Sequence, residues 1–363
     1  MTQTGIPFVF MRGGTSRGPY VNRADLPEDR AILADVLVAM VGSGHPLNID
    51  GLGGGATVTT KVAILSPSDD AWADVDYFFA QVSVEDRLVD FKPTCGNILV
   101  GVGPAAIEMG IVPTRGEVTD VNIRAVNTGA RVTASIKTPR GAIAYEGETA
   151  IDGVPGTASP IGLRFMDVVG GVTGSLFPTG HRQDTIEGIT VSCMDVAMPM
   201  VIARADDFGL TGYEGAAELD DNAAFLARME AVRLVAGERM GMGEVGKSVT
   251  PKFGLLAPAR EGGSATVRYF TPWSCHPTVA VTGSQCLAAC LLADGTIGVG
   301  LMSRRPEAPA KVVLEHPMGK MDVLVEYTQD DTDFTVTSAG LERTARKIAQ
   351  GSVFVPPSVW PGN

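Results

Sequence analysis

Two cysteines in this chain each come just before a helix-length segment that is apolar all round. Cys95 precedes a segment that ends at Gly110, and Cys275 precedes one that ends near Gly295. A helix without a polar face is a buried helix, and its first turn presents unpaired N–H groups that attract anions and lower the pKa of a thiol. The sequence therefore predicts a duplicated architecture with two buried helices and an acid–base site between two lobes.

Lys61 lies in a predicted strand over residues 57–65, and the side chains that share its face are small or apolar. Burial lowers the pKa of a lysine and can make it a base near neutral pH. Periodicity alone favours a solvated strand lysine instead, because Val58, Val62 and Ile64 make the opposite face more apolar.

A glycine turn over residues 12–16 is flanked by predicted strands at 6–11 and 18–22. Arg12 and the main-chain N–H groups of the turn are suited to grip a carboxylate. The simpler interpretation is a tight glycine turn without a ligand.

Residues 241–248 match the P-loop pattern letter for letter, and they also match the dinucleotide glycine pattern. Both patterns need a strand before the glycines and a helix after them. A helical segment comes before this motif, and a β-prone stretch broken by Pro251 follows it. We interpret the match as coincidental and predict a loop that binds no nucleotide.

Composition argues against several classes of function. The net charge of −12 argues against a nucleic-acid partner, and no apolar run reaches the length that spans a membrane. The first residues lack the pattern of a signal peptide, and five cysteines without tight spacing suit a reducing compartment, so we expect a cytoplasmic protein. The four histidines are scattered without metal-ligand spacing, and we expect no metal site.

Many short predicted strands with few helices indicate an α+β fold with mainly antiparallel sheets. Strands are expected at 75–84, 118–125, 130–137, 141–147, 161–168, 188–193, 199–204, 252–257, 265–271, 311–316, 321–327 and 333–337. Helical periodicity covers 27–42 and 214–240, and a short basic stretch runs from Arg343 to Lys347. We place the domain boundary in the Gly/Pro-rich stretch around 178–181.

A family resemblance runs from end to end of the chain. It rests on the blocks Met11–Gly18, Ile49–Gly54, Thr60–Ala63, Cys95–Leu99, Asp152–Gly156, Leu176–Gly180, Met198–Pro199, Pro251–Lys252, Cys275–His276, His316–Gly319 and Arg343–Arg346. With these blocks the chain resembles the family of methylaconitate isomerase and 4-oxalomesaconate tautomerase, and it is most similar to the oxalomesaconate branch. The resemblance implies a fold like that of diaminopimelate epimerase, with two similar lobes that each wrap a curled sheet around a central helix, and a C-terminal segment that returns to the first lobe. With this return, the expected first lobe comprises residues 1–182 plus 340–363, and the second comprises residues 183–339.

The resemblance also implies cofactor-free isomerisation of an unsaturated keto-polycarboxylate in the catabolism of gallate and lignin-derived aromatics. Lys61 and Cys95 match the catalytic pair of the methylaconitate relatives, and Cys275 is assigned to substrate binding because His276-Pro277 departs from the epimerase glycine pattern. The other expected substrate-binding residues are Arg12, Gly13, Gly14, Thr15, Ser16, Gly53, Gly54, Gly96, Asn97, Met198, His276, Thr278, Gly283 and Ser284.

Several alternatives stay open at this point. The reaction is either a keto–enol tautomerisation or a 1,3-allylic shift, and aconitate, methylaconitate or methylitaconate are alternative substrates. A noncatalytic carboxylate-binding protein on the same fold is the alternative from another class. The expected partner is a small tricarboxylate or keto-polycarboxylate, with no nucleic acid and no membrane, and a homodimer is one option for the assembly.

Overall fold

A computed structural model describes residues 3–302, 304–330 and 333–362 of the chain. It divides into two compact units, the first formed by Met1–Leu163 with Glu342–Asn363 and the second by Arg164–Leu341. The first boundary therefore comes before the expected Gly/Pro-rich stretch at 178–181. The reason is that residues 170–182 bond to the second unit, where Leu176 O accepts from Asp195 N and Arg182 O accepts from the Ser192 hydroxyl.

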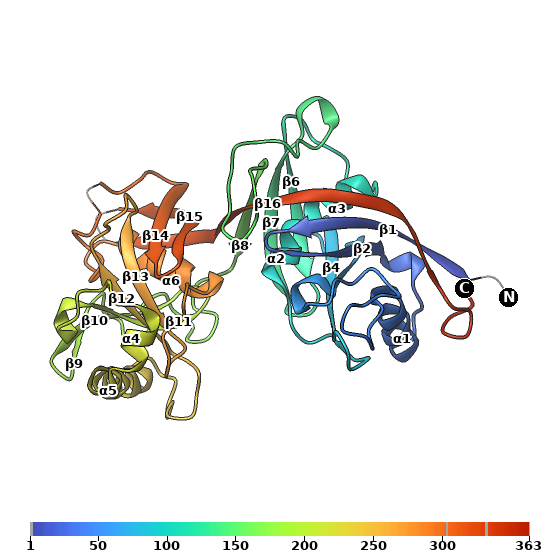
Figure 1. The fold of residues 1–363 in the computed structure, drawn as a ribbon. Coiled ribbons are helices and arrows are strands. Elements are labelled where there is room, and N and C mark those ends of the chain that lie inside the picture. Colours follow the sequence, from blue (N-terminus) through green and yellow to red (C-terminus); the bar gives the residue numbers. More distant parts are fainter. Residues whose placement is uncertain (1–2, 303, 331–332, 363) are drawn as a thin grey trace. The chain divides into compact units, whose positions relative to one another are not determined.

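The first unit is built on a sheet in the order β16-β1-β2-β3-β4-β6-β7-β8, with β5 beside β4 (Figure 1). Its strands are β1 (Thr4–Gly13), β2 (Ser16–Asn22), β3 (Lys61–Pro67), β4 (Val75–Val82), β5 (Val89–Asp90), β6 (Val118–Ala125), β7 (Ala130–Lys137), β8 (Pro160–Met166) and the C-terminal part of β16 (Phe334–Val355). Its helices are α1 (Arg30–Val41), α2 (Gly96–Val100) and α3 (Val102–Glu108), with short 3₁₀ turns η1 (Arg23–Asp25), η2 (Thr57–Thr59) and η3 (Pro139–Gly141).

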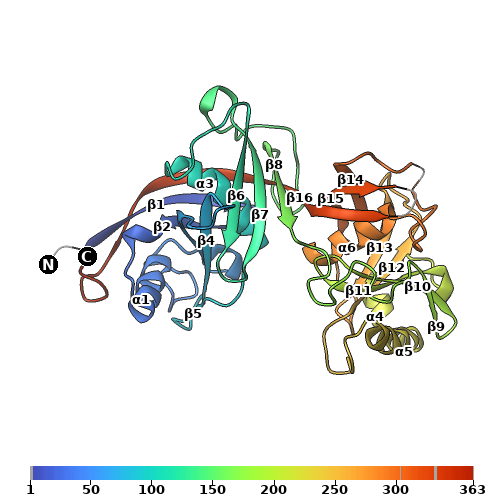
Figure 2. The same cartoon turned by 180° about the vertical axis from the view of Figure 1, so that it is seen from behind.

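The second unit is built on a sheet in the order β16-β15-β14-β13-β12-β11-β10-β9 (Figure 2). Its strands are β9 (Asp184–Ile186), β10 (Ile189–Asp195), β11 (Pro199–Arg204), β12 (Lys252–Ala257), β13 (Ala265–Phe270), β14 (Ala310–His316), β15 (Gly319–Gln329) and the N-terminal part of β16. Its helices are α4 (Ala216–Asp220), α5 (Ala223–Arg239) and α6 (Val281–Leu292), with a 3₁₀ turn η4 (Asp206–Phe208).

The two units repeat one pattern of strand pairing. In the first, β1–β2, β3–β4 and β6–β7 are antiparallel, whereas β2–β3 and β4–β6 are parallel. In the second, β10–β11, β12–β13 and β14–β15 are antiparallel, whereas β11–β12 and β13–β14 are parallel. A parallel pair needs a crossover connection, and the helices supply it at matching places in both units. The predicted α+β fold and its duplication are confirmed.

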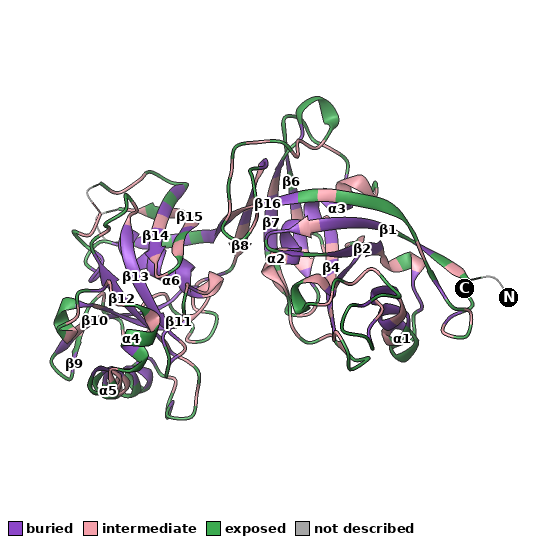
Figure 3. Ribbon diagram, in the orientation of Figure 1, coloured by how far each residue is buried: buried purple, intermediate pink, exposed green. Residues whose placement is uncertain are grey.

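Helices cover both faces of each sheet. In the first unit α1 packs on one face with Val62, Ile64 and Ala80, and α2 and α3 lie on the other. In the second unit α6 is buried on one face, and α5 packs with Phe253 and Leu255 on the other. Figure 3 shows α6 as a buried helix, while the C-terminal part of β16 is largely exposed.

Several expected elements differ from the structure. The segment after Cys95 is not one helix, because Pro104 lacks the N–H that would bond to the carbonyl of Val100, and the helix breaks at Gly101. Residues 57–59 form η2, so β3 begins only at Lys61. The strand predicted at 141–147 is absent among the described residues.

The basic stretch at 343–347, for which the sequence analysis assigned no element, is part of the long strand β16 (Phe334–Val355). Strand β16 pairs with β15 before this stretch and with β1 along it. This pairing returns the C-terminal residues to the first unit. None of the helices in the described part of the chain is both long enough and apolar enough to cross a membrane.

Candidate active site

The glycine turn between β1 and β2 touches the start of α2. A Cβ added at Gly13 would collide with the main-chain carbonyl of Asn97, and one added at Gly14 would collide with the Asn97 side chain. Gly14 also has a φ of +51°, which favours glycine. The Thr15 N–H donates to Asn97 Oδ1 over 3.3 Å. The glycines are therefore required for the close approach of the turn to α2, rather than only for its tightness.

Cys95 is the residue that caps the start of α2, as predicted for the first cysteine. It is partly exposed, its side chain makes no capping hydrogen bond, and a Cβ added at the next residue, Gly96, would meet nothing within 4 Å. The main chain is thus open at Gly96, the residue that follows Cys95 at this end of the helix. The first main-chain N–H groups of α2 are not occupied by a side-chain cap.

Two buried tyrosines hold this end of α2. The Tyr77 hydroxyl donates to the main-chain carbonyl of Cys95 over 3.3 Å, and the Tyr20 hydroxyl donates to that of Ile98 over 2.6 Å. Burial raises the pKa of Tyr20 and of Tyr77, and the nearby Cys95 thiol raises both further. Both hydroxyls are thus protonated donors to the main chain, and they position Cys95.

Lys61 is the first residue of β3 and is partly buried. Its Nζ donates to Gln81 Oε1 over 2.6 Å and lies 5.3 Å from the centre of the Phe79 ring on β4. The Gln81 amide nitrogen bonds to Thr60 and Val82, so its oxygen is held toward the lysine. The amine therefore has a fixed direction and an apolar neighbour.

Strand alternation places Lys61 on the α2 face of the sheet. Val62 and Ile64 share the face of β3 that packs on α1, so alternation turns Lys61 to the opposite face. On β4, Tyr77 and Phe79 share one face, and Tyr77 contacts the start of α2. Lys61 and Cys95 are thus on the same side of the first unit's sheet, next to alternate residues of β4.

Arg12 lies on the opposite side of β1 from Cys95. Gly13, its neighbour, faces α2, so alternation turns the Arg12 side chain away. Its Nη1 donates to the carbonyls of Gly14 and Thr344 over 2.8 and 2.9 Å. The structure therefore separates Arg12 from the thiol, although the sequence grouped it with the carboxylate-binding turn.

The two glycines expected to bind substrate in the loop before β3, Gly53 and Gly54, are closely packed against other residues. Gly53 packs against Asn48 and the carbonyl of Val41, whereas Gly54 lies against the Arg17 guanidinium and Thr59. Of the turn itself, Thr15 is exposed and Ser16 is buried.

Cys275 does not stand at the start of α6, which corrects the prediction for the second cysteine. The capping residue of α6 is Ala280, because His276 N–H bonds back to the carbonyl of Tyr269 and Pro277 follows. The Cys275 N–H donates to Asp220 over 2.6 Å, and its side chain belongs to the α5 side of the core. Burial raises the pKa of Cys275 to about 11.

The other candidates of the second unit are partly committed to internal contacts. His276 Nδ1 accepts from the Thr278 N–H over 3.0 Å, and the Ser284 hydroxyl donates to the carbonyl of Val281. Gly283 is packed against the ring of Tyr269, which leaves no room for a side chain. Met198 is half-buried in the turn between β10 and β11.

The P-loop-like segment 241–248 lies between α5 and β12, as predicted, so neither flanking element fits a nucleotide site. The buried Arg233 instead bonds to the carbonyls of Val245, Ser248 and Pro251. In the part of the chain that the structure describes, no group of three metal-ligand side chains gathers.

Sequence reasoning missed Tyr20, Tyr77 and Gln81, which position the two central residues. These three residues could be identified only from the register of β3 against β4 and of β2 against β3. Strand propensity does not reveal register. It also missed Arg346, which stands directly opposite Arg12 in the β1–β16 pair, although the sequence 343–346 was part of the resemblance.

Comparison with known proteins places the whole chain in one group. The family model described as "PrpF protein" matches residues 3–356. The chain is 44% identical over 349 residues to the (4E)-oxalomesaconate Delta-isomerase of Novosphingobium sp. (strain KA1), and the aligned region covers 96% of this chain and 97% of that protein. It is 41% identical over 362 residues to the 4-oxalomesaconate tautomerase of Pseudomonas putida, and the aligned region covers 100% of this chain and 99% of that protein.

A solved structure is similar to this chain over nearly its whole length. The crystal structure of methylitaconate-delta-isomerase matches with a TM-score of 0.87 and 33% identity, covering 99% of this chain and 97% of that one. At this identity the match supports both the fold and a relationship between the chains.

Proposed function

Because this chain belongs to the PrpF family and is an isomerase, we propose that it moves a proton and a double bond within 4-oxalomesaconate. The observation that carries the proposal is that Lys61 and Cys95 lie on one face of one sheet, with their positions held by β4. Full-length relatives named for oxalomesaconate isomerisation and tautomerisation support this substrate.

Lys61 is the proposed base. In its neutral form the amine takes a proton from the carbon next to the keto or carboxylate group, and the electron pair of that C–H bond enters the conjugated system as a dienolate. Gln81 fixes the direction of the amine through the 2.6 Å hydrogen bond. The ring of Phe79 covers one side of the amine and limits its contact with water.

Cys95 is the proposed acid or donor. Cys95 stands at the start of α2, just before the open main chain at Gly96, and its thiol can donate to the dienolate oxygen or return a proton to the distant carbon. The Asn97 side chain is held by Thr15 through its oxygen, and its amide nitrogen is directed away from that bond and suits a substrate carboxylate. One proton leaves and one returns, so the reaction balances without a cofactor.

Both reactions that the relatives' names describe pass through the same dienolate. Return of the proton to oxygen or to carbon decides between a tautomer and an allylic isomer. We further propose, from the family resemblance, that the reaction serves the catabolism of gallate and lignin-derived aromatics in the cytoplasm.

A second candidate substrate is methylitaconate or methylaconitate. The structural match to methylitaconate-delta-isomerase favours it, because the fold and the length of that chain are shared. The higher identity to the oxalomesaconate relatives makes it the second choice.

The test is a direct comparison of substrates. Purified enzyme is mixed with 4-oxalomesaconate, methylaconitate or methylitaconate, and the ultraviolet absorbance is followed while NMR identifies the product. We expect kcat/KM to be highest for 4-oxalomesaconate. A larger kcat/KM for methylitaconate or methylaconitate would replace our assignment with the second candidate, and no turnover of any of the three would contradict both.

A further inference from the structure

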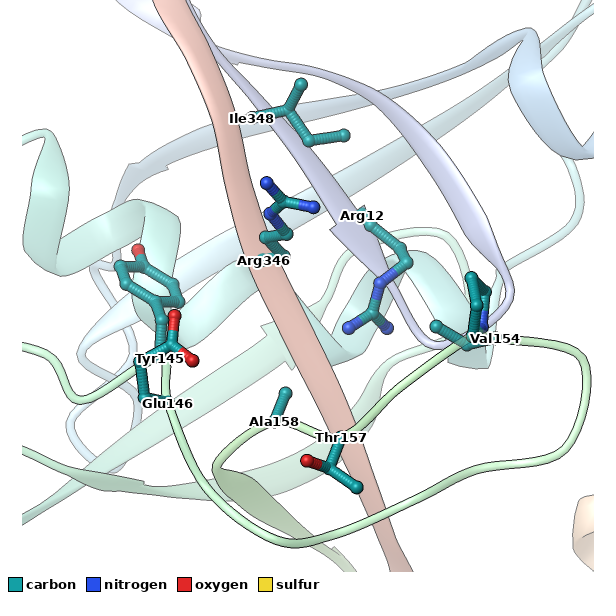
Figure 4. Close-up of a pocket in the computed structure, with 9 residues that line it drawn as sticks. Arg12, Tyr145, Glu146, Val154, Thr157, Ala158, Arg346 and Ile348 are labelled. Atoms are coloured by element: carbon teal, nitrogen blue, oxygen red, sulfur yellow. The ribbon is translucent and has the colours of Figure 1, made fainter.

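A pocket of about 420 Å³ lies in the first unit on the side of β1 and β16 that faces away from α2. Its lining comes from the two strands and from the segment 145–158, which passes over them (Figure 4). Arg12, Arg346 and Ile348 point into it from the strands, as alternation requires. On the other side of β16, Lys347 bonds to Glu108 of α3. Arg346 therefore faces the pocket, whereas Lys347 faces α3.

Two arginines, Arg12 and Arg346, face this pocket. Arg12 and Arg346 are directly opposite in the register of β1 and β16, and like charges in such a pair destabilise a sheet. The bonds of Arg12 go to main-chain carbonyls, and among the described residues neither guanidinium forms an ion pair with a carboxylate. Burial lowers the pKa of Arg12, and the charge of Arg346 lowers it further.

The remaining lining narrows the class of ligand. Thr157 presents a hydroxyl, and Val154, Ala158 and Ile348 supply apolar surface. The volume suits a small molecule rather than a peptide or a nucleotide chain. Glu146 also lines the pocket, so a ligand must place a donor such as a hydroxyl beside this carboxylate.

We propose that this pocket binds a small hydroxy-polycarboxylate, whose carboxylates are held by Arg12 and Arg346 and whose hydroxyl faces Glu146. The site is distinct from the face that carries Lys61 and Cys95, and it does not rest on the proposed function. Two adjacent guanidinium groups offer the paired donors that carboxylates accept best.

Calorimetry with citrate tests the proposal, using Arg346→Gln and the matched control Lys347→Gln. Both changes remove one positive charge from neighbouring positions of β16, but only the first faces the pocket. We expect Arg346→Gln to weaken citrate binding by about tenfold or more, since a charge-assisted hydrogen bond contributes about 1.5–3 kcal/mol. Lys347→Gln is expected to bind like the wild type, and the kcat of Arg346→Gln without citrate is expected to be unchanged.

Titrations with other ligands and with a second variant identify the ligand chemistry. Tricarballylate lacks the hydroxyl of citrate and is expected to bind more weakly, and inorganic phosphate is expected to bind more weakly still. If Arg346→Gln unfolds, Arg346→Lys keeps the charge without the planar fork and is expected to lose part of the affinity. Absence of citrate binding to the wild type, equal binding by Arg346→Gln, an equal loss in Lys347→Gln, or preference for phosphate would each overturn the proposal. None of these results depends on which substrate the enzyme isomerises.

Discussion

The hydroxyl of Tyr77 on β4 donates a hydrogen bond to the main-chain carbonyl of Cys95 over 3.3 Å. The same strand carries Phe79 and Gln81, which contact the amine of Lys61. The thiol and the lysine are therefore positioned by successive side chains on one face of a single strand. This arrangement makes β4 the element that sets their separation.

Tyr77→Phe is expected to lower kcat by up to about tenfold while KM changes little, because one neutral hydrogen bond contributes about 0.5–1.5 kcal/mol. The change loosens the start of α2 without removing a reacting group. Steady-state kinetics measures the effect. Tyr213→Phe is the matched control, since it also removes a tyrosine bond to a main-chain carbonyl, that of Pro258. Equal kinetics for both variants would show that Tyr77 does not position Cys95.

Cys95→Ser is expected to lower kcat by about two to four powers of ten, the usual contribution of a general acid or donor. Cys275→Ser is expected to lose far less, because Cys275 is 5% exposed and packs on the α5 side of its core. The kinetics are compared after thermal melting has shown that both variants are folded. A larger loss for Cys275→Ser, with Cys95→Ser near the wild type, would reverse the assignment.

The free energy of unfolding is expected to fall as the pH rises from 9 to 11. Burial raises the pKa of Cys275 and of Cys290 to about 11 from an ordinary value of 9.0. In this window the unfolded chain releases thiol protons that the folded chain retains, so the unfolded state is favoured as pH increases. Urea unfolding at several pH values measures the slope. Cys290→Ala is expected to have a shallower slope, and a stability that rises with pH in this window would contradict the account.

Mg-ATP is expected not to bind at residues 241–248. The segment follows α5 and precedes β12, and several of its carbonyls are bonded to the buried Arg233. Calorimetry tests this directly. Micromolar binding that Lys247→Ala abolishes would show that the glycine motif is a nucleotide site after all.

Much of the fold was predictable where periodicity and composition agree. The strands 118–125, 130–137, 199–204 and 252–257 have the predicted bounds, because each alternates or runs as a short apolar segment between turn residues. The strand β16 was not predictable as one element. Its basic residues around 343–347 have no alternating apolar pattern, and they form a strand because β1 pairs with residues 345–347.

The candidate site likewise has a part that could be predicted from the sequence and a part that could not. The position of Cys95 at the start of α2 follows from local signals, namely a glycine after the thiol and an apolar run behind it. Cys275 has a similar local sequence, but its N–H donates to Asp220 and the N–H of His276 donates to the carbonyl of Tyr269, so this segment does not enter α6. The Lys61–Gln81 bond depends on the register of two strands that are separated in sequence, and no single-sequence pattern encodes it.

Solvent deuterium exchange in Lys61→Met tests the central claim, that Lys61 removes the substrate proton. 4-Oxalomesaconate is incubated in D₂O with the wild type, Lys61→Met or Lys61→Arg, and NMR follows deuterium in substrate and product. Arginine keeps the charge but cannot act as a base, because it stays protonated. We predict exchange with the wild type and none above background with either variant, while thermal stability is retained. Exchange at the wild-type rate in Lys61→Met would show that the base is another residue.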